Sequence, residues 1–162
     1  MAEIRPATNE DRDAIWKIFR AVFGPGDTYA VDPHISREEA LAYWFRPCTH
    51  TYVAEHNRHV VGTYVLKPNQ AGAGSHVANA AFMVAPDARG QGIGRAMGEH
   101  CLSTARRLGF RAMQFNFVVS TNTSAIHLWE RLGFRIVGTL PGAFQHPQKG
   151  YVDVYVMYRS LL

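Results

Sequence analysis

Hydrophobic positions in the first third of the chain repeat with the period of a helix. Apolar residues recur every three to four positions between Ile15 and Val22, and this predicts a helix over residues 9–23. The glycines and proline of residues 24–26 end it. A second helix is predicted to follow Ser36, because Ser36 and Glu39 have the spacing of a capping box.

The middle and the end of the chain change to strand-like patterns separated by turn residues. Strands are predicted over residues 2–5, 51–55, 59–66, 76–84, 113–119, 134–140 and 151–158, helices over 92–108 and 123–132, and loops over 27–35, 67–75 and 141–150. This order does not alternate as a Rossmann fold does. It predicts a single α/β (mixed α+β) domain over residues 1–162, built on a mixed sheet.

Composition narrows the class of protein without deciding its function. Hydrophobic residues make up 47% and charged residues 19% of the 162 residues, which is typical of a globular protein. Neither a membrane-spanning apolar run nor a secretory signal is visible, and only Cys48 and Cys101 occur, so we expect a cytoplasmic protein without disulfides. The net charge of +4 suits a polyphosphate ligand, and the scattered Lys and Arg residues argue against nucleic acid as a partner.

The sharpest chemical signal is a glycine-rich segment between a buried strand and a helix. Gly90, Gly92 and Gly94 alternate at the helix start, with Arg89 and Arg95 beside them. Glycines let backbone N–H groups converge, and the start of a helix adds free N–H donors and a positive dipole end. The segment therefore predicts a site for a pyrophosphate.

Two other phosphate-binding motifs do not fit this segment. A Walker A loop requires Gly-Lys-Ser/Thr, and no lysine is present between Val84 and Gly94. A dinucleotide fingerprint requires a third glycine at a position that is Arg95 or Met97 here. The remaining alternative is a strand–helix turn that binds nothing, which three alternating glycines flanked by arginines disfavour.

The segment Arg89-x-x-Gly92-x-Gly94 resembles the acetyl-CoA motif of the GNAT acetyltransferases. The stretch from Asn122 to Phe134 is similar to a second block of that family, and residues 26–44 more weakly resemble its phosphinothricin-type subgroup. The resemblance covers residues 4–158. It implies a GNAT-like acyl-CoA N-acyltransferase fold, with a central twisted mixed sheet of about seven strands and helices on both faces.

The resemblance also implies a path for the coenzyme between two strands that diverge. Its pantetheine arm would pair with the backbone of the strand before the glycine turn, where an N–H of Met83 or Val84 would stabilise the oxyanion. The residues implied to bind acetyl-CoA are Phe82, Met83, Val84, Arg89, Gly90, Gln91, Gly92, Ile93, Gly94, Arg95, Asn122, Ser124 and Trp129. Asn122 can also act as a plain helix N-cap.

The chain departs from the family pattern at both expected catalytic positions. The strand over residues 76–84 has no glutamate to act as a base, and Trp129 stands where many members have a tyrosine as general acid. His76 and Asn79 are the substitutes on that strand, and Tyr155 is a candidate proton donor to the thiolate. An exposed His at a strand end and a Tyr packed in the core are the competing interpretations.

The acceptor pocket is expected to use Tyr29, Glu55 and Phe144, of which Glu55 could act as a base or remain a solvated hairpin carboxylate. The eight histidines show no metal-ligand spacing with Cys or carboxylate partners, so no metal is expected.

The resulting hypothesis is an N-acetyltransferase that moves acetyl from acetyl-CoA to the amine of a small molecule, such as an amino acid or a similar compound. The alternatives are acetylation of a protein N-terminus or lysine, or a module that binds acetyl-CoA without catalysis. The hypothesis includes neither a nucleic-acid nor a membrane partner. The resemblance allows a homodimer and leaves the oligomeric state open.

Overall fold

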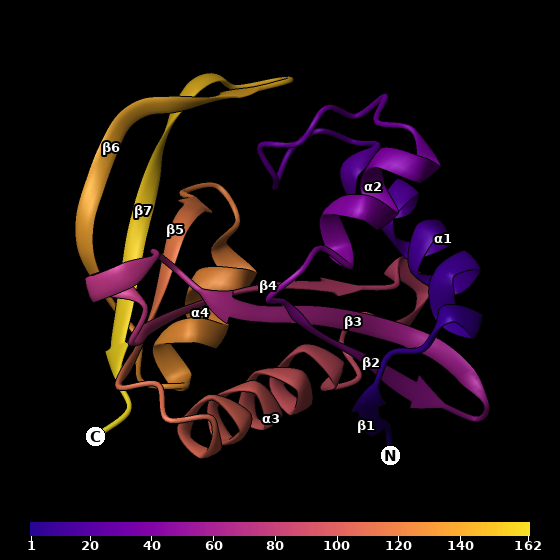
Figure 1. Ribbon diagram of the computed structural model, residues 1–162. Coiled ribbons are helices and arrows are strands. Elements are labelled where there is room, and N and C mark those ends of the chain that lie inside the picture. Colours follow the sequence, from indigo (N-terminus) through magenta and orange to yellow (C-terminus); the bar gives the residue numbers. More distant parts are fainter.

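The computed structural model describes residues 1–162, and its seven strands form one continuous mixed sheet (Figure 1). The strands are β1 Glu3–Pro6, β2 His50–His56, β3 His59–Pro68, β4 Val77–Val84, β5 Ala112–Val119, β6 Arg135–His146 and β7 Gly150–Ser160. The helices are α1 Arg12–Phe23, α2 Arg37–Trp44, α3 Ile93–Arg107 and α4 Thr123–Arg131. The predicted order of elements and the mixed α/β class are confirmed. None of these helices is long and apolar enough to span a membrane.

The sheet has the order β1-β2-β3-β4-β5-β7-β6, and β4 with β5 is its parallel pair. Helices α1 and α2 cover one face of β2–β4, where Phe19 and Trp44 pack with Met83 in a buried cluster. Helices α3 and α4 cover the other face around Met97 and Trp129. Both faces of the central strands are therefore buried, as the apolar run of β4 predicts.

Local sequence signals account for where α2 begins and where α1 ends. The side chain of Ser36 accepts a hydrogen bond of 3.1 Å from the Glu39 N–H, which confirms the predicted N-cap of α2. The N–H of Gly24 still bonds to the carbonyl of Arg20, and the chain then turns at Gly26, whose φ is +69°. The loop over residues 24–36 leaves α1 at this point.

The prediction of a loop over residues 141–150 is wrong. Strands β6 and β7 extend through most of it and pair as far as His146 and Gly150. A register shift between Leu140 and Phe144 absorbs Pro141 and Gly142, so cross-strand pairing continues past residues that usually mark a turn. The result is a long hairpin that rises above the rest of the sheet (Figure 1).

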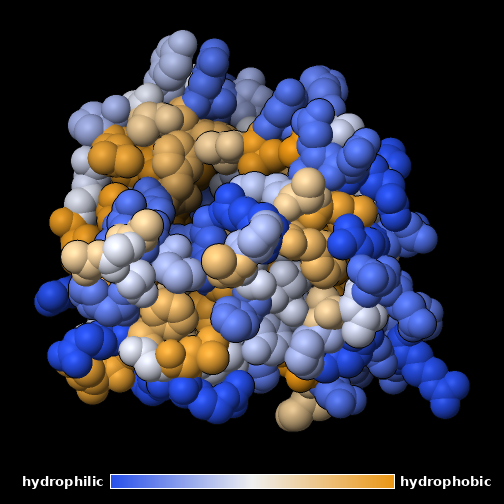
Figure 2. Space-filling model, in the orientation of Figure 1, coloured by the Kyte–Doolittle hydropathy of each residue, from blue (hydrophilic) through white to orange (hydrophobic).

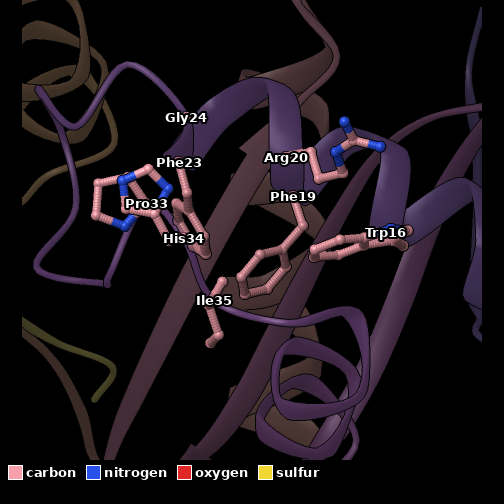
Figure 3. A pocket seen from close by; sticks show the side chains of 8 residues that line it. All are labelled: Trp16, Phe19, Arg20, Phe23, Gly24, Pro33, His34 and Ile35. Atoms are coloured by element: carbon pink, nitrogen blue, oxygen red, sulfur yellow. The ribbon is translucent and has the colours of Figure 1, made fainter.

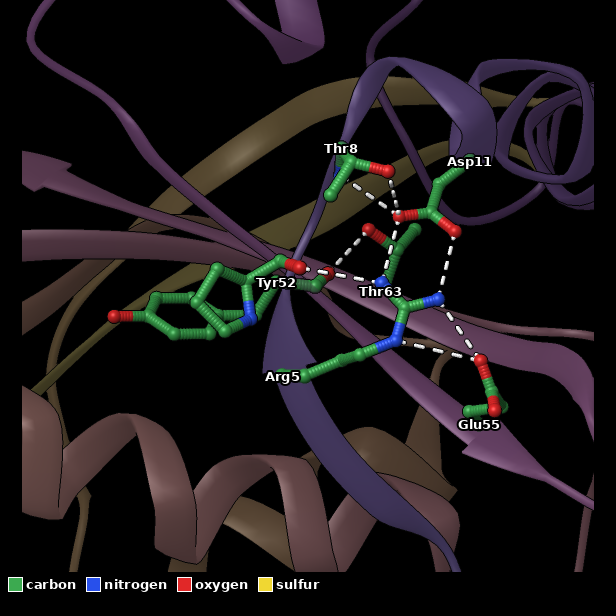
Figure 4. A network of polar contacts seen from close by, with 7 residues as sticks. Arg5, Thr8, Asp11, Tyr52, Glu55 and Thr63 are labelled. Carbon is green, nitrogen blue, oxygen red and sulfur yellow. Dashed lines mark hydrogen bonds and ion pairs between the residues drawn. The ribbon is translucent and has the colours of Figure 1, made fainter.

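Charged side chains at the start of the chain form a network between β1, β2 and the beginning of α1 (Figure 4). Arg5 donates to both carboxylate oxygens of Asp11 at 2.8 and 2.9 Å and to Glu55 at 2.8 Å. The Asp11 side chain is 6% exposed, and the Thr8 N–H also donates to it at 2.7 Å. The hydrogen bonds from Arg5 are the largest cause that holds the pKa of Asp11 below its ordinary value.

We predict that Arg5→Gln lowers the free energy of unfolding by about 1–3 kcal/mol at pH 7, because it leaves a buried carboxylate without its cation. Since the folded-state pKa of Asp11 is lowered, its stabilising contribution exists above the unfolded pKa and disappears as the pH falls through the folded value. Urea unfolding of both proteins should therefore show the difference at pH 7 shrinking below pH 4. The control is Arg131→Gln, an exposed position on α4; an equal loss in this control would contradict the network.

Candidate functional site

Strands β4 and β5 begin as neighbours and then separate. Their pairing consists of Val77 with Ala112 and Ala78 with Met113, and it ends there. Figure 1 shows the two strands running in different directions beyond this point, with β5, β7 and β6 turned away from β2–β4. A gap therefore opens in the middle of the sheet.

The phase of the β3–β4 ladder determines which backbone groups face this gap. The Ala85 N–H bonds to the Val61 carbonyl and the Asn69 N–H to the Val77 carbonyl, both at 2.8 Å. Antiparallel pairs alternate every two residues, so Met83 exchanges its hydrogen bonds with Thr63 on β3. The residues that turn their N–H and C=O groups toward β5 are Ala78, Ala80, Phe82 and Val84.

The closed end of the gap is held by a side chain. Asn79 follows the last paired residue of β4, and its Nδ2 donates to the Gln114 carbonyl of β5 at 2.9 Å. This bond continues the strand pairing by one step after the backbone ladder has ended. Beside it, Gln114 donates to Asn116 at 2.9 Å and Asn116 to Asn69 at 2.7 Å. Neutral amides, with no carboxylate on β4 or β5, line this end.

The glycine-rich turn lies at the other end of β4 and leads into α3. Gly90 and Gly92 have φ of +77° and +79°, and neither has an atom within 4 Å of where a Cβ would stand. Hydrogen bonding from this turn resumes with the Ala96 N–H to the Gly92 carbonyl, and no loop or cap bond is donated by the N–H groups of residues 90–95. The turn therefore offers unpaired donors at a positive helix end, which suits an anion such as a diphosphate.

The polar side chains around the turn differ in whether they are free to bind a ligand. Arg95 is paired with Glu99 at 2.9 Å on the exposed side of α3, whereas Arg89 is exposed without an ion pair. Asn122 caps α4, since its Oδ1 accepts from the Ala125 N–H at 3.4 Å and from the Ser124 hydroxyl at 3.3 Å. Its Nδ2 makes no hydrogen bond and is free to donate to a ligand. The two interpretations of Asn122 are thus compatible.

Aromatic rings line the gap on the side of α3 and α4. The ring of Trp129 lies 4.8 Å from that of Phe82 on β4 and 4.6 Å from that of Phe115 on β5. The indole therefore bridges the two strands where they separate. Trp129 offers packing at this position and no acid.

Tyr29 reaches the same strand from the opposite face. It belongs to the loop over residues 24–36, and its hydroxyl donates to the Phe82 carbonyl. Burial raises the pKa of Tyr29 to about 12. Phe144, on the β6–β7 hairpin, is buried with Val119 and faces the ring of Phe117 at 6.2 Å. Tyr29 therefore borders the gap at β4, and Phe144 lies against β5 from the β6–β7 hairpin.

Three other expected site residues lie elsewhere. His76 is exposed just before β4, at the closed end, where its carbonyl accepts from Arg111. Tyr155 packs on the α3–α4 side of β7 and is separated from β4 by β5. Glu55 lies on β2, two strands from β4, and is paired with Arg5 of β1. The structure does not bring these three side chains to the gap.

A separate pocket of about 420 Å³ lies between α1 and the loop over residues 24–36 (Figure 3). Its lining residues are Trp16, Phe19, Arg20, Phe23, Gly24, Pro33, His34 and Ile35, none of which belongs to β4 or β5. Figure 2 shows a hollow with hydrophobic atoms on the face where the β6–β7 hairpin rises. No three His, Cys, Asp or Glu residues stand close enough together to hold a metal ion.

Gln114 and Asn69, which belong to the amide group beside Asn79, were missed by the sequence interpretation. The signal available was the alternation of β5, in which Gln114 and Asn116 fall on the face opposite Met113 and Phe115. That alternation indicates that Gln114 and Asn116 share a face of the strand. It could not identify Asn69 as the partner of Asn116, because Asn69 lies on a loop.

Comparisons with known proteins agree with this geometry. The model of the acetyltransferase (GNAT) family matches residues 12–134. The N-acetyltransferase aca1 of Schizosaccharomyces pombe is 34% identical over 148 residues, which cover 81% of this chain and 71% of aca1. A GCN5-related N-acetyltransferase from Kribbella flavida is 46% identical with a TM-score of 0.94, covering 98% of this chain and 97% of that one. A GNAT superfamily phosphinothricin acetyltransferase from Sinorhizobium meliloti, solved in complex with AcCoA, is 25% identical with a TM-score of 0.84, covering 98% and 88%.

We predict that Gly92→Ala weakens the binding of coenzyme A at least tenfold, because an alanine at this positive φ turns the donors of the helix start away from the diphosphate. The matched control is Gly109→Ala at the other end of α3, where φ is +88° and space is equally open. Both variants should lose roughly 1–2 kcal/mol of stability to backbone strain. Calorimetric titration with coenzyme A should separate them, and equal binding by both variants would remove the turn from the site.

Proposed function

Because the chain belongs to the GNAT family of acetyltransferases, with acetyl-CoA as its acetyl donor, we propose that it acetylates the amine of a small molecule such as an amino acid. The observation that carries this proposal is the gap between β4 and β5, which opens beside a turn of unpaired N–H groups. The loop over residues 24–36 folds back to Phe82 and confines the acceptor side, which favours a small acceptor over a protein chain. The similarity to a phosphinothricin acetyltransferase supports the same choice.

In this proposal the coenzyme lies along the gap-facing edge of β4. The N–H groups of residues 90–95 hold its diphosphate, and Arg89 adds charge. The backbone of Val84 pairs with the pantetheine arm, while Asn122 donates through its free Nδ2. Ser124 and Trp129 border the same path on α4. Met83, whose backbone groups face β3, supports the strand through its buried side chain.

The proposed reaction is direct aminolysis of the thioester. The lone pair of the neutral amine forms a bond to the carbonyl carbon, and the carbonyl electrons move onto oxygen. The Phe82 N–H, which faces the gap, stabilises this oxyanion. When the C=O bond re-forms, the C–S bond breaks, and the proton lost by the amine ends on the thiolate sulfur or on water. The main contribution of the protein is to place the two reactants together.

The proposed site has no side chain placed to remove a proton from the acceptor amine. Neither β4 nor β5 carries a carboxylate, and His76 is exposed at the closed end of the gap. The site as proposed therefore receives an amine that has already lost its proton to water, rather than deprotonating it through a side chain.

We predict that kcat/KM rises about tenfold per pH unit up to the pKa of the acceptor amine, and that the midpoint moves with that pKa when different acceptors are compared. The measurement is acetyl transfer from acetyl-CoA across a panel of amino acids, other primary amines and short peptides. A midpoint that is shared by all acceptors and disappears in His76→Ala would instead assign the proton to His76. Transfer to peptides alone would overturn the small-molecule acceptor.

A further inference from the structure

The contact between Tyr29 and Phe82 joins the acceptor loop to the strand that faces the coenzyme. Tyr29 comes from the loop between α1 and α2, and its ring packs against that of Phe23 with centroids 5.0 Å apart. Its hydroxyl donates to the Phe82 carbonyl, although the two residues are 53 positions apart in the chain. The hydroxyl therefore lies at the backbone edge of the gap, on the face opposite Trp129.

Phe82 presents two different groups to the gap. Its C=O accepts from Tyr29, and its N–H points to the same side of the strand, because both groups of one residue face the same neighbour in an antiparallel ladder. In the proposed reaction this N–H holds the oxygen of the thioester. The Tyr29 hydroxyl is then a side-chain polar group held beside the backbone that receives the thioester.

We propose that Tyr29 is a positioning residue for the acceptor amine. Its hydroxyl oxygen accepts a hydrogen bond from an amine N–H, while the hydroxyl proton is donated to the Phe82 carbonyl. This inference rests on the proposed acetyl transfer to an amine and names the group that orients that amine. A neutral primary amine has two N–H groups and one lone pair. If Tyr29 Oη and the second lone pair of the Phe82 carbonyl each accept one N–H, the nitrogen lone pair points at the thioester carbon.

The chemistry of the phenol fits orientation and excludes a role as base at neutral pH. Burial of the hydroxyl is the largest cause that raises its pKa to about 12, and the nearby phenol of Tyr43 acts in the same direction. Tyr29 therefore stays neutral over the working range and keeps the proton that it donates to Phe82. A neutral hydroxyl in this state has free acceptor lone pairs and no free donor.

The test compares wild type, Tyr29→Phe and a control, Tyr52→Phe. Tyr29→Phe keeps the ring that packs on Phe23 and removes only the hydroxyl. Tyr52 is a half-buried tyrosine on β2, two strands from β4, and its hydroxyl makes no hydrogen bond. Each protein is assayed with the best primary amine of the panel and with its N-methyl derivative, which has one N–H fewer. Coenzyme A binding is measured by calorimetry.

We expect Tyr29→Phe to lower kcat for the primary amine roughly 10- to 100-fold. The preference for the primary amine over its N-methyl derivative should shrink by about tenfold, while the affinity for coenzyme A stays within about twofold. Tyr52→Phe should match wild type in all three measurements.

Three results would overturn the inference while the proposed function stands. These are unchanged kcat in Tyr29→Phe, a lower kcat with the same preference between the two amines, and a parallel loss of coenzyme A affinity. The second result would mean that Tyr29 only anchors the loop. A wild-type protein that binds coenzyme A and acetylates no amine would overturn the proposed function together with this inference.

Discussion

Two strands that share a sheet but pair at only two positions leave unpaired backbone groups in its interior, and the site depends on this constraint. Beyond Ala78 the N–H and C=O groups of Ala80, Phe82 and Val84 have no strand partner on the side of β5. An unpaired backbone group that is removed from water costs free energy comparable to a lost hydrogen bond. An extended ligand with amide groups of its own can form hydrogen bonds with these backbone groups. The same unpaired groups that cost stability can therefore bind a ligand.

Phe82, at the edge of the gap, is contacted from both faces of the sheet. Trp129 packs on its ring from the side of α3 and α4, and Tyr29 donates to its carbonyl from the side of α1 and α2. Asn79 fixes where the gap begins, three residues earlier on the same strand. In the proposed reaction, backbone groups and neutral side chains take the place of a carboxylate and an acidic tyrosine. Such a site would orient the reactants and stabilise an oxyanion, and it would depend on the solvent to remove the proton.

The features that could be predicted from the sequence are those fixed by residues close together in the chain. The glycines between Gly90 and Gly94 and the capping box at Ser36 gave the turn and the helix start correctly, because φ preferences and caps act within one helical turn. The hairpin beyond Leu140 was missed because cross-strand pairing overrode the usual effect of Pro141. The contacts of Tyr29 with Phe82 and of Glu55 with Arg5 could not be predicted, since each joins segments about 50 residues apart.

The two halves of the site therefore differ in how the sequence encodes them. In the proposed site, the coenzyme half uses backbone groups of one nearly continuous stretch, from Phe82 to Arg95, and its shape depends on main-chain geometry that many side chains tolerate. The proposed acceptor half uses side chains from the loop over residues 24–36 and from the β6–β7 hairpin, which are remote in sequence. Substitutions in that half can change a hydrogen bond to the acceptor, or the shape of the surface around it, without disturbing the strand proposed to hold the coenzyme. Acceptor preference is consequently the property of this fold that is easiest to change and hardest to infer from sequence.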